Sequence, residues 1–368
     1  MTSSPVSTRR SWRVFIAVSV LAVVAVALVT ISPLRVYVMR RAPTDRRPDE
    51  TSYVIAAAGD IVCSPAMQRR VQERAERLPV NDTGVPSDSR PPRSCAASAT
   101  ADVLREVAPA TVLTLGDVQY ECGDAAEFES AYSATWGQFR SVSRPVVGNH
   151  EYGGSCGRSD ASGYFDYFGQ AAGEKGWYSF DVGGWHLIAL NSECHAGRGL
   201  ESVGGCDLGS EQYRWLQADL AAHKNACTLA YWHEPRFTSG QHGPARQMAD
   251  IWNELVAAKV DVVLSAHNHI YERFDFIGHT DPPKDIGQDL DSVLETPKLD
   301  PQGIQQFVVG TGGRNLFRFM KPPVVGEVVR DDTSFGVLSM TLKPGSYDWE
   351  FVPVKGSTFQ DRGSAKCR

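Results

Sequence analysis

The chain has 368 residues, of which 42% are hydrophobic and 22% charged, and its formal net charge is −6. This composition is typical of a globular protein and excludes collagen-like, coiled-coil and wholly disordered chains. Residues 1–50 contain eight arginines and three acidic residues, a net charge of +5, so residues 51–368 carry −11. An acidic body lacks the basic face that nucleic-acid binding requires, so we expect no nucleic-acid partner.

An uncharged apolar run, Val14–Ile31, follows three arginines near the start of the chain. The run is long enough for a helix that crosses the hydrocarbon core, and the arginines before it are typical of an export signal. No small-x-small cleavage site follows it. We therefore expect residues 1–50 to form a signal anchor, with one transmembrane helix at about residues 14–32, and an Arg-rich linker.

All eight cysteines follow this run, and none forms a CxxC pair. An even number of scattered cysteines favours disulfides in an oxidising compartment, and free buried thiols are the alternative.

Five arginines directly after the apolar run favour the opposite orientation, with the domain that follows the run in the cytoplasm. Giving the cysteines more weight, we expect a single-pass protein of the cell membrane with its main domain outside the cytoplasm, or a secreted protein if the signal is cleaved. Eight cysteines allow roughly a hundred connectivities. The expected pairs are Cys63–Cys95, Cys122–Cys156, Cys194–Cys206 and Cys227–Cys367.

Short apolar runs alternate with helical segments from Tyr53 onward, which predicts one α/β layered domain over residues 51–368. Strands are expected at Tyr53–Ala58, Thr111–Leu115, Pro145–Val147, Trp185–Leu190, Thr228–Trp232 and Val260–Ser265. Helices are expected at Ala99–Val107, Ala125–Phe139, Glu211–His223 and Ala245–Ala258. Two hairpins, within 175–190 and 335–354, make the sheets mixed. Residues 64–94 and 276–303 are expected to be surface insertions.

Polar side chains follow five of these strands, at the point where each strand ends. They are Asp60, Asp117, Tyr120, Asn149, His150, His233, His267 and His269. Ligands bind at the carboxyl ends of strands in open α/β sheets. Carboxylate, imidazole and amide groups without thiolate suit iron, zinc or manganese. Eight such groups are too many for one tetrahedral zinc ion, but they suit two metal ions that share a carboxylate.

These residues form motifs in a fixed order: GD (59–60), GDxxY (116–120), GNHE (148–151), a single histidine (233) and HxH (267–269). The order resembles that of the calcineurin-like metallophosphoesterases, and the tyrosine of GDVQY resembles the purple acid phosphatase branch. The resemblance covers about residues 54–353 and implies a layered α/β/β/α sandwich of mixed sheets. Two positions depart from the family pattern, because Val62 stands in place of the second glycine of GDxG and Ala266 in place of the glycine of GHxH.

The resemblance also implies a site with two metal ions that share Asp117. Fe(III) would take Asp60, Asp117, Tyr120 and His269. A divalent Fe, Zn or Mn ion would take Asp117, Asn149, His233 and His267. His150 and His242 would face the substrate phosphate, and His242 could donate a proton to the leaving group. The implied nucleophile is a metal-bound hydroxide.

Four of these residues also have a simpler interpretation. Asp60 and Asp117 could cap helices, Tyr120 could be a packed aromatic residue, and His242 could be a solvent-exposed loop residue. The five motifs in one order favour the site. The expected activity is hydrolysis of phosphate monoesters in a small phosphorylated substrate. The open alternatives are a phosphodiesterase acting on nucleotides or lipid head groups, and a non-catalytic surface binding module. The sequence carries no signal for an oligomeric state.

Several polar residues near these motifs have less specific expectations. Arg314, in a glycine-rich segment, is a candidate for binding phosphate. Glu151 either orients His150 or faces solvent. We expect His186, in the middle of a strand, to be structural, and His223 to lie on the surface.

Overall fold

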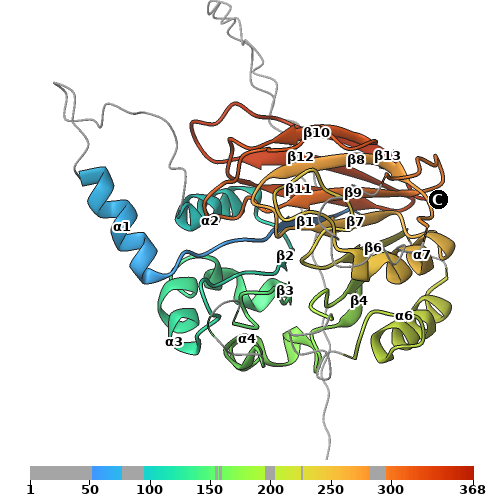
Figure 1. The fold of residues 1–368 in the computed structure, drawn as a ribbon, viewed down its shortest axis with the longest axis horizontal. Helices are drawn as coiled ribbons and strands as arrows, with labels where there is room; N and C mark the ends of the chain where they lie inside the picture. Colours follow the sequence, from blue (N-terminus) through green and yellow to red (C-terminus); the bar gives the residue numbers. More distant parts are fainter. Residues whose placement is uncertain are drawn as a thin grey trace, which may run out of the picture. The chain divides into compact units, whose positions relative to one another are not determined.

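The computed structural model describes residues 52–76, 95–153, 156, 160–194, 204–224, 227–281 and 296–368. This part of the chain contains two mixed β-sheets with helices packed against them (Figure 1). The α/β fold expected from the sequence is therefore confirmed. Among the described residues, no helix is both long and apolar enough to cross a bilayer. The transmembrane helix expected at about residues 14–32 lies outside the described residues.

The first sheet has six strands in the order β13-β12-β11-β1-β2-β3. They are β1 (Tyr53–Ala58), β2 (Thr111–Leu115), β3 (Ser143–Val146), β11 (Gly336–Lys343), β12 (Ser346–Pro353) and β13 (Arg362–Lys366). Strands β1, β2 and β3 are parallel, with Ala56 beside Val112 and Leu113 beside Arg144. Strand β2 is buried along its whole length, which explains why its sequence is a nearly continuous apolar run.

The second sheet has seven strands in the order β10-β8-β9-β7-β6-β5-β4. They are β4 (Tyr178–Val182), β5 (Trp185–Ala189), β6 (Cys227–Tyr231), β7 (Val262–Ser265), β8 (Tyr271–Ile277), β9 (Ile304–Val309) and β10 (Glu327–Asp331). Strands β5, β6, β7 and β9 are parallel, and β4, β8 and β10 are antiparallel to their neighbours. The carboxyl ends of the parallel strands therefore meet at one edge of this sheet.

Large aromatic side chains join the two sheets. Trp185 on β5 donates a hydrogen bond from its indole nitrogen to the carbonyl of Lys343 on β11, at 2.9 Å. Its ring lies 5.6 Å from the ring of Tyr347 on β12. The Tyr347 hydroxyl in turn donates to the side chain of Gln305 on β9, also at 2.9 Å. These contacts place the core between the sheets, where burial of aromatic surface stabilises the fold.

The helical segments lie in the connections between strands. They are α1 (Pro65–Glu76), α2 (Ala97–Val107), α3 (Ala125–Glu127), η1 (Phe128–Tyr132), η2 (Trp136–Val142), α4 (Ser162–Phe168), η3 (Gly169–Ala172), α6 (Glu211–Ala222), η4 (Arg246–Met248) and α7 (Ala249–Ala257). Helix α2 packs against β11 and β12 of the first sheet. Helices α6 and α7 lie beside the second sheet (Figure 1). The Ser210 hydroxyl caps α6 by accepting a hydrogen bond from the Tyr213 amide at 3.3 Å.

The expected strands all form, and each bound lies within two residues of its predicted position. The single helix predicted over Ala125–Phe139 is wrong, because this segment forms α3, a π-helix and a 3₁₀-helix. A turn before Trp136 lets its indole donate to Thr100 on α2 at 2.9 Å, and this contact overrides helix propensity. The segment expected to be a surface insertion from residue 64 begins with helix α1, and none of its described side chains over residues 65–73 is buried.

All four expected disulfides are present: Cys63–Cys95, Cys122–Cys156, Cys194–Cys206 and Cys227–Cys367. The last pair joins β6 to the end of the chain. Because every cysteine is paired, the alternative of free buried thiols is excluded. Four disulfides are typical of a protein that lies outside the cytoplasm.

Candidate metal centre

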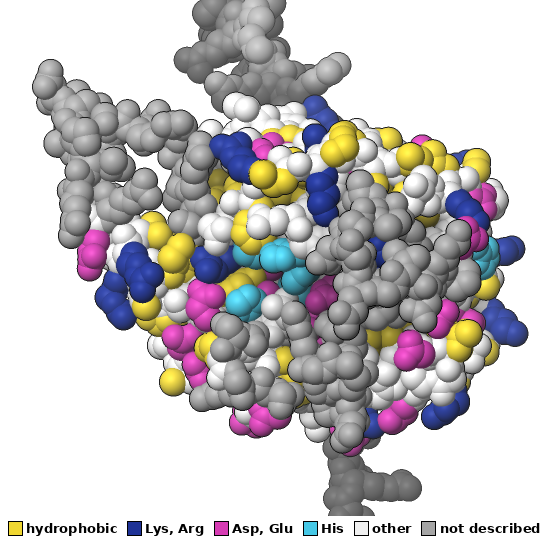
Figure 2. Space-filling model, in the orientation of Figure 1, with side chains coloured by type: hydrophobic (Ala, Val, Ile, Leu, Met, Phe, Trp, Pro, Cys, Tyr) yellow, Lys and Arg dark blue, Asp and Glu magenta, His cyan; other side chains and the backbone are white. Residues whose placement is uncertain are grey.

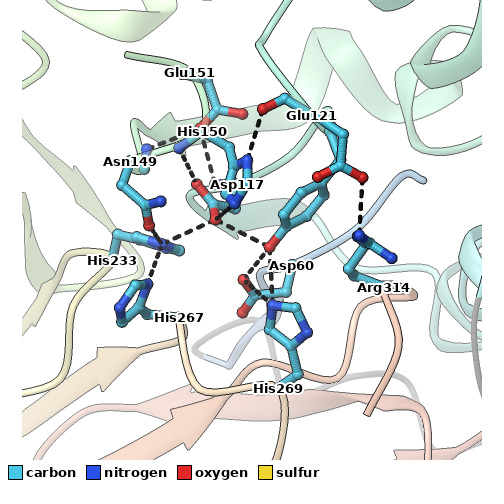
Figure 3. A network of polar contacts seen from close by, with 12 residues as sticks. Asp60, Asp117, Glu121, Asn149, His150, Glu151, His233, His267, His269 and Arg314 are labelled. Atoms are coloured by element: carbon cyan, nitrogen blue, oxygen red, sulfur yellow. Dashed lines mark hydrogen bonds and ion pairs between the residues drawn. The ribbon is translucent and has the colours of Figure 1, made fainter. Parts of the chain in front are cut away.

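The predicted ligands converge where the two sheets present the carboxyl ends of their parallel strands (Figure 3). Asp60 follows β1, Asp117 follows β2, His233 follows β6, and His267 follows β7. Asp60, Asp117 and His267 have positive φ angles of 58°, 47° and 63°. Non-glycine residues rarely adopt this conformation, and it occurs preferentially at functional sites. The turns thus direct side chains away from the strands and toward a common centre.

Four side chains form the first ligand cluster, with the Tyr120 hydroxyl at its middle. This oxygen lies 2.7 Å from an oxygen of Asp60, 3.0 Å from Oδ2 of Asp117 and 3.0 Å from Nε2 of His269. The other Asp60 oxygen, Oδ2, is buried and has no hydrogen-bond partner in the described part of the chain. An orphaned carboxylate oxygen beside a phenol and an imidazole fits a hard metal ion.

The second ligand cluster adjoins the first and shares Asp117 with it. Nε2 of His233 lies 3.2 Å from the amide oxygen of Asn149, 3.4 Å from Oδ2 of Asp117 and 3.1 Å from Nδ1 of His267. Oδ2 of Asp117 is therefore close to both clusters. The groups of Asp117, His233 and His267 are also near enough to one another to hold a single metal ion. The donor set fits a divalent metal.

Glycines beside the ligands leave room for this close approach. A Cβ atom at Gly148 would lie 2.3 Å from Oδ1 of Asp117, and one at Gly116 would lie 2.6 Å from Nδ1 of His233. Gly116 also has a φ angle of +80°, which side chains rarely permit. The glycine in GD and in GN is thus required by the packing of the two ligand clusters.

Backbone carbonyls fix the proton position on two of the histidines. Nδ1 of His233 lies 2.8 Å from the carbonyl of Leu115, and Nδ1 of His269 lies 2.6 Å from that of Asn315. If each Nδ1–H donates to its carbonyl, Nε2 keeps its lone pair and points into the cluster. This arrangement is typical of metal-binding histidines. The ring of Phe317 stacks on His269 at 4.0 Å between centroids and holds the imidazole in place.

Glu151 links the loops that carry the ligands, a role the sequence analysis left open. Its buried carboxylate accepts hydrogen bonds from the backbone amides of Asp117, Val118, Gln119 and Gly148, at 2.8, 2.8, 3.2 and 2.8 Å. It therefore neither faces solvent nor orients the imidazole of its neighbour. Burial and the nearby charge of Asp117 raise its pKa to about 7, although the backbone donors favour the charged form.

The charges of the two clusters perturb one another strongly. Burial alone would raise the pKa of Asp117, but the neighbouring histidines, His233 first, hold it well below its usual value. Burial would lower the pKa of His233, but Asp117 outweighs this and raises it well above its usual value. Burial and the charge of His233 lower the pKa of His267. Burial and the two aspartates raise the pKa of Tyr120, so its phenolate form requires added positive charge.

A cavity of about 210 Å³ opens beside the two clusters. Figure 2 shows histidine side chains gathered in a hollow on this face of the molecule. Both predicted substrate-facing histidines line the cavity. Nδ1 of His150 lies 2.6 Å from the carbonyl of Glu121, and the ring of His242 lies 4.6 Å from that of His267. Burial lowers the pKa of His242, and His269 lowers it further.

Arg314 also lines the cavity, but it is held by other partners. Its guanidinium donates to the Glu121 carboxylate at 2.8 Å and lies 5.0 Å from the centre of the Tyr120 ring (Figure 3). The cation therefore supports the face of the tyrosine ring. Arg314, Phe317 and Asn315 lie some 45 residues beyond the HxH motif, and no spacing signal links them to it. Glu151, in contrast, is the last residue of the GNHE motif, so its position next to the site follows from the sequence.

Comparison with known proteins agrees with this geometry. A family model described as calcineurin-like phosphoesterase matches residues 44–271, more than half of the chain. The chain belongs to the calcineurin-like phosphoesterase family. Within this family, it is similar to purple acid phosphatase 22 of Arabidopsis thaliana, 31% identical over 169 residues, which is 44% of this chain and 32% of that protein. It is also similar to acid phosphatase type 7 of Mus musculus, 28% identical over 231 residues, which is 54% and 47% of the two chains.

The similarity to the purple acid phosphatase branch is thus confirmed, although the matches cover only a third to a half of these relatives. Among solved structures, purple acid phosphatase PPD1 from yellow lupin seeds matches with a TM-score of 0.60 at 18% identity. That match covers 86% of this chain and 54% of the lupin protein, and it supports the fold of the calcineurin-like phosphoesterase domain.

Proposed function

We propose that this chain is a metal-dependent phosphoesterase of the purple acid phosphatase type that hydrolyses phosphate monoesters at a binuclear centre. One observation carries the proposal: Oδ2 of Asp117 lies 3.0 Å from the Tyr120 hydroxyl and 3.4 Å from Nε2 of His233. A carboxylate oxygen shared by two ligand clusters is what a bridged pair of metal ions requires. A structural metal site would need only one of the clusters.

The two clusters define which residues would hold the metal ions. The proposed Fe(III) ligands are Asp60, Asp117, Tyr120 and His269, and the proposed ligands of the divalent Fe, Zn or Mn ion are Asp117, Asn149, His233 and His267. Metal ions bound here would supply Lewis acidity toward phosphoryl oxygens and lower the pKa of a water molecule. The orphaned Asp60 oxygen supports a cation in the first cluster.

His150 and His242 would act on the substrate rather than on the metals. With Nδ1 of His150 at the Glu121 carbonyl, Nε2 is left for a phosphate oxygen. His242 is held by its backbone amide, which donates to Asn268 at 2.9 Å, so its imidazole is free to face the cavity. We infer that His242 donates the proton that the leaving oxygen needs when the P–O bond breaks.

The proposal is tested by turnover of an aryl phosphate monoester and of an aryl phosphate diester. The matched blank is Asp117→Ala, which removes the shared carboxylate. We expect the wild type to hydrolyse the monoester faster than the diester, and the blank to lose at least a hundredfold in both. A diester preference would move the function to phosphodiester hydrolysis. Equal activity of wild type and Asp117→Ala would overturn the assignment of the site.

The iron assignment has its own test, which does not depend on turnover. A tyrosinate bound to Fe(III) absorbs visible light, so we expect the iron-loaded protein to be coloured and Tyr120→Phe to lose the band while keeping its fold. The comparison uses visible absorption together with metal content. A colourless protein that holds two zinc or manganese ions would refute the iron assignment and leave the binuclear site intact.

We also propose that the apolar run Val14–Ile31 anchors the chain in the membrane with the catalytic domain outside the cytoplasm. The four disulfides support the compartment, and the length of the run supports the anchor. We expect the full chain to remain in the membrane fraction after carbonate extraction and to be digested by protease added to spheroplasts. Recovery in the medium would indicate cleavage of the signal.

A further inference from the structure

A second group of metal-binding side chains lies far from the candidate centre in the fold. It consists of Asp181 on β4, His186 on β5, and Asp219 and His223 at the end of α6. His186 is near the start of β5, whereas the candidate centre lies beyond the carboxyl ends of the parallel strands β6 and β7. The group therefore occupies the opposite end of the second sheet. The proposed phosphoesterase reaction does not use any residue of this group.

The hydrogen bonds within this group orient both imidazoles. Nε2 of His186 lies 2.8 Å from a carboxylate oxygen of Asp219, and Nδ1 of His223 lies 2.8 Å from the backbone carbonyl of the same residue. The Ser179 hydroxyl donates to the other Asp219 oxygen at 2.7 Å. Both histidines thus use one nitrogen to contact a fixed acceptor on α6. This carboxylate-to-histidine arrangement is how outer partners orient metal-binding imidazoles.

Asp181 and the two imidazoles also lie close to one another. Nδ1 of His186 lies 2.8 Å from an oxygen of Asp181, and the two imidazole rings stack with centroids 3.9 Å apart and an angle of 12°. One donor atom from each of Asp181, His186 and His223 lies within 4.8 Å of the others. Zinc bound at about 2.0–2.2 Å needs its ligands roughly 3.4 Å apart and in the plane of each ring, so the His223 imidazole must turn out of the stack to reach the same ion as His186.

The exposure of the two outer residues allows that movement. His186 is buried, with 1% of its side chain exposed, and Asp219 is 9% exposed, so these two positions are fixed by packing. Asp181 is 66% exposed and His223 is 36% exposed. Asp181 is also the second-last residue of β4, close to the hairpin turn at Gly183 and Gly184, so its exposed side chain can move without disturbing the core.

We propose that Asp181, His186 and His223 bind a divalent transition metal ion, best matched by Zn²⁺, at a site separate from the binuclear centre. Two imidazoles and one carboxylate with an open fourth position are a common zinc ligand set. The two aspartates balance the charge of a divalent cation. The ion takes the position between Asp181 and Nδ1 of His186, and a proton on that nitrogen passes to solvent. It ties the β4–β5 hairpin to α6.

The experiment counts zinc and measures thermal stability in the full chain. Protein stripped with a chelator is reloaded with Zn²⁺, desalted and analysed for zinc per chain. We expect His223→Gln and Asp181→Asn each to bind one zinc ion fewer than wild type. Zn²⁺ should raise the melting temperature of the wild type more than that of either variant. His279→Gln replaces an exposed histidine outside the group and is the matched control.

The outcomes separate this proposal from the proposed function. Both substituted side chains are partly exposed, so the variants should fold and retain phosphoester turnover. Loss of one zinc ion together with unchanged turnover supports the site. Equal zinc content in wild type, His223→Gln and Asp181→Asn overturns the proposed zinc site. The group would then be a protonated His186 hydrogen-bonded to two carboxylates. If the proposed function is wrong, wild type and variants alike would lack turnover. The difference in zinc count between wild type and the two variants would be unchanged.

Discussion

Replacing Glu151 with glutamine should destabilise the loops that carry the proposed metal ligands. One carboxylate oxygen accepts the amides of Val118 and Gln119, and the other accepts those of Asp117 and Gly148. Glutamine offers one acceptor oxygen and one donating NH₂ group. In either orientation of the amide, two buried backbone N–H groups would face a donor and lose their partner.

The size of the effect follows from the cost of buried polar groups without partners. Each such group costs about 1–3 kcal/mol, so Glu151→Gln should lower the free energy of unfolding by about 2–6 kcal/mol. That loss is large beside the roughly 5–15 kcal/mol by which native domains are stable. The same change should weaken metal binding about 10- to 100-fold, because outer partners of ligands have effects of this size.

The assay is urea unfolding of the metal-free protein with its disulfides intact, followed by metal titration of the folded variant. Glu174→Gln changes an exposed glutamate and serves as the control, with an expected difference below about 0.5 kcal/mol. A Glu151→Gln protein that unfolds at the same urea concentration as the control and binds metal as tightly as wild type would refute the role assigned to the carboxylate. Normal stability with weakened metal binding would restrict that role to positioning the ligands.

Two further predictions concern stability away from the centre. Burial and the charge of Glu327 raise the pKa of Glu272 from 4.5 to about 7. The stability that the protonated form of Glu272 contributes is therefore complete below pH 4.5 and is lost as the pH rises through 7. Between pH 4.5 and 8, the free energy of unfolding of the wild type should fall by about 3 kcal/mol relative to Glu272→Gln, and the exposed Glu350→Gln should show no such change. Loop-closure entropy predicts that removing Cys227–Cys367, which spans 140 residues, costs about 5 kcal/mol, whereas removing Cys194–Cys206, which spans 12, costs about 3 kcal/mol. Thermal unfolding of the two double alanine variants measures these losses, and we expect the larger loss for the variant without Cys227–Cys367. A larger loss for the variant without Cys194–Cys206 would contradict the entropic account.

The convergence of the candidate ligands could be predicted because they follow strands that the sequence marks clearly. Strands such as β1 and β2 are buried, so their apolar runs end abruptly at a polar ligand. The supporting residues were harder to find. Phe317 stacks on His269 from a loop after β9, and Trp136 breaks a predicted helix to contact α2. Each contact joins two segments that are far apart in the sequence, and no local pattern connects them.

The sequence by itself determined the strands, the order of the ligand motifs and the separation of cysteines from the apolar run, because each follows from local hydrophobicity or residue type. Only the tertiary structure decided how these parts meet. It brings Asp117 within reach of both ligand clusters, and it places Glu151 among four backbone amides. It also stacks His186 on His223 from a strand and a helix. The packing of two sheets and their connecting helices sets these distances, which sequence spacing does not contain.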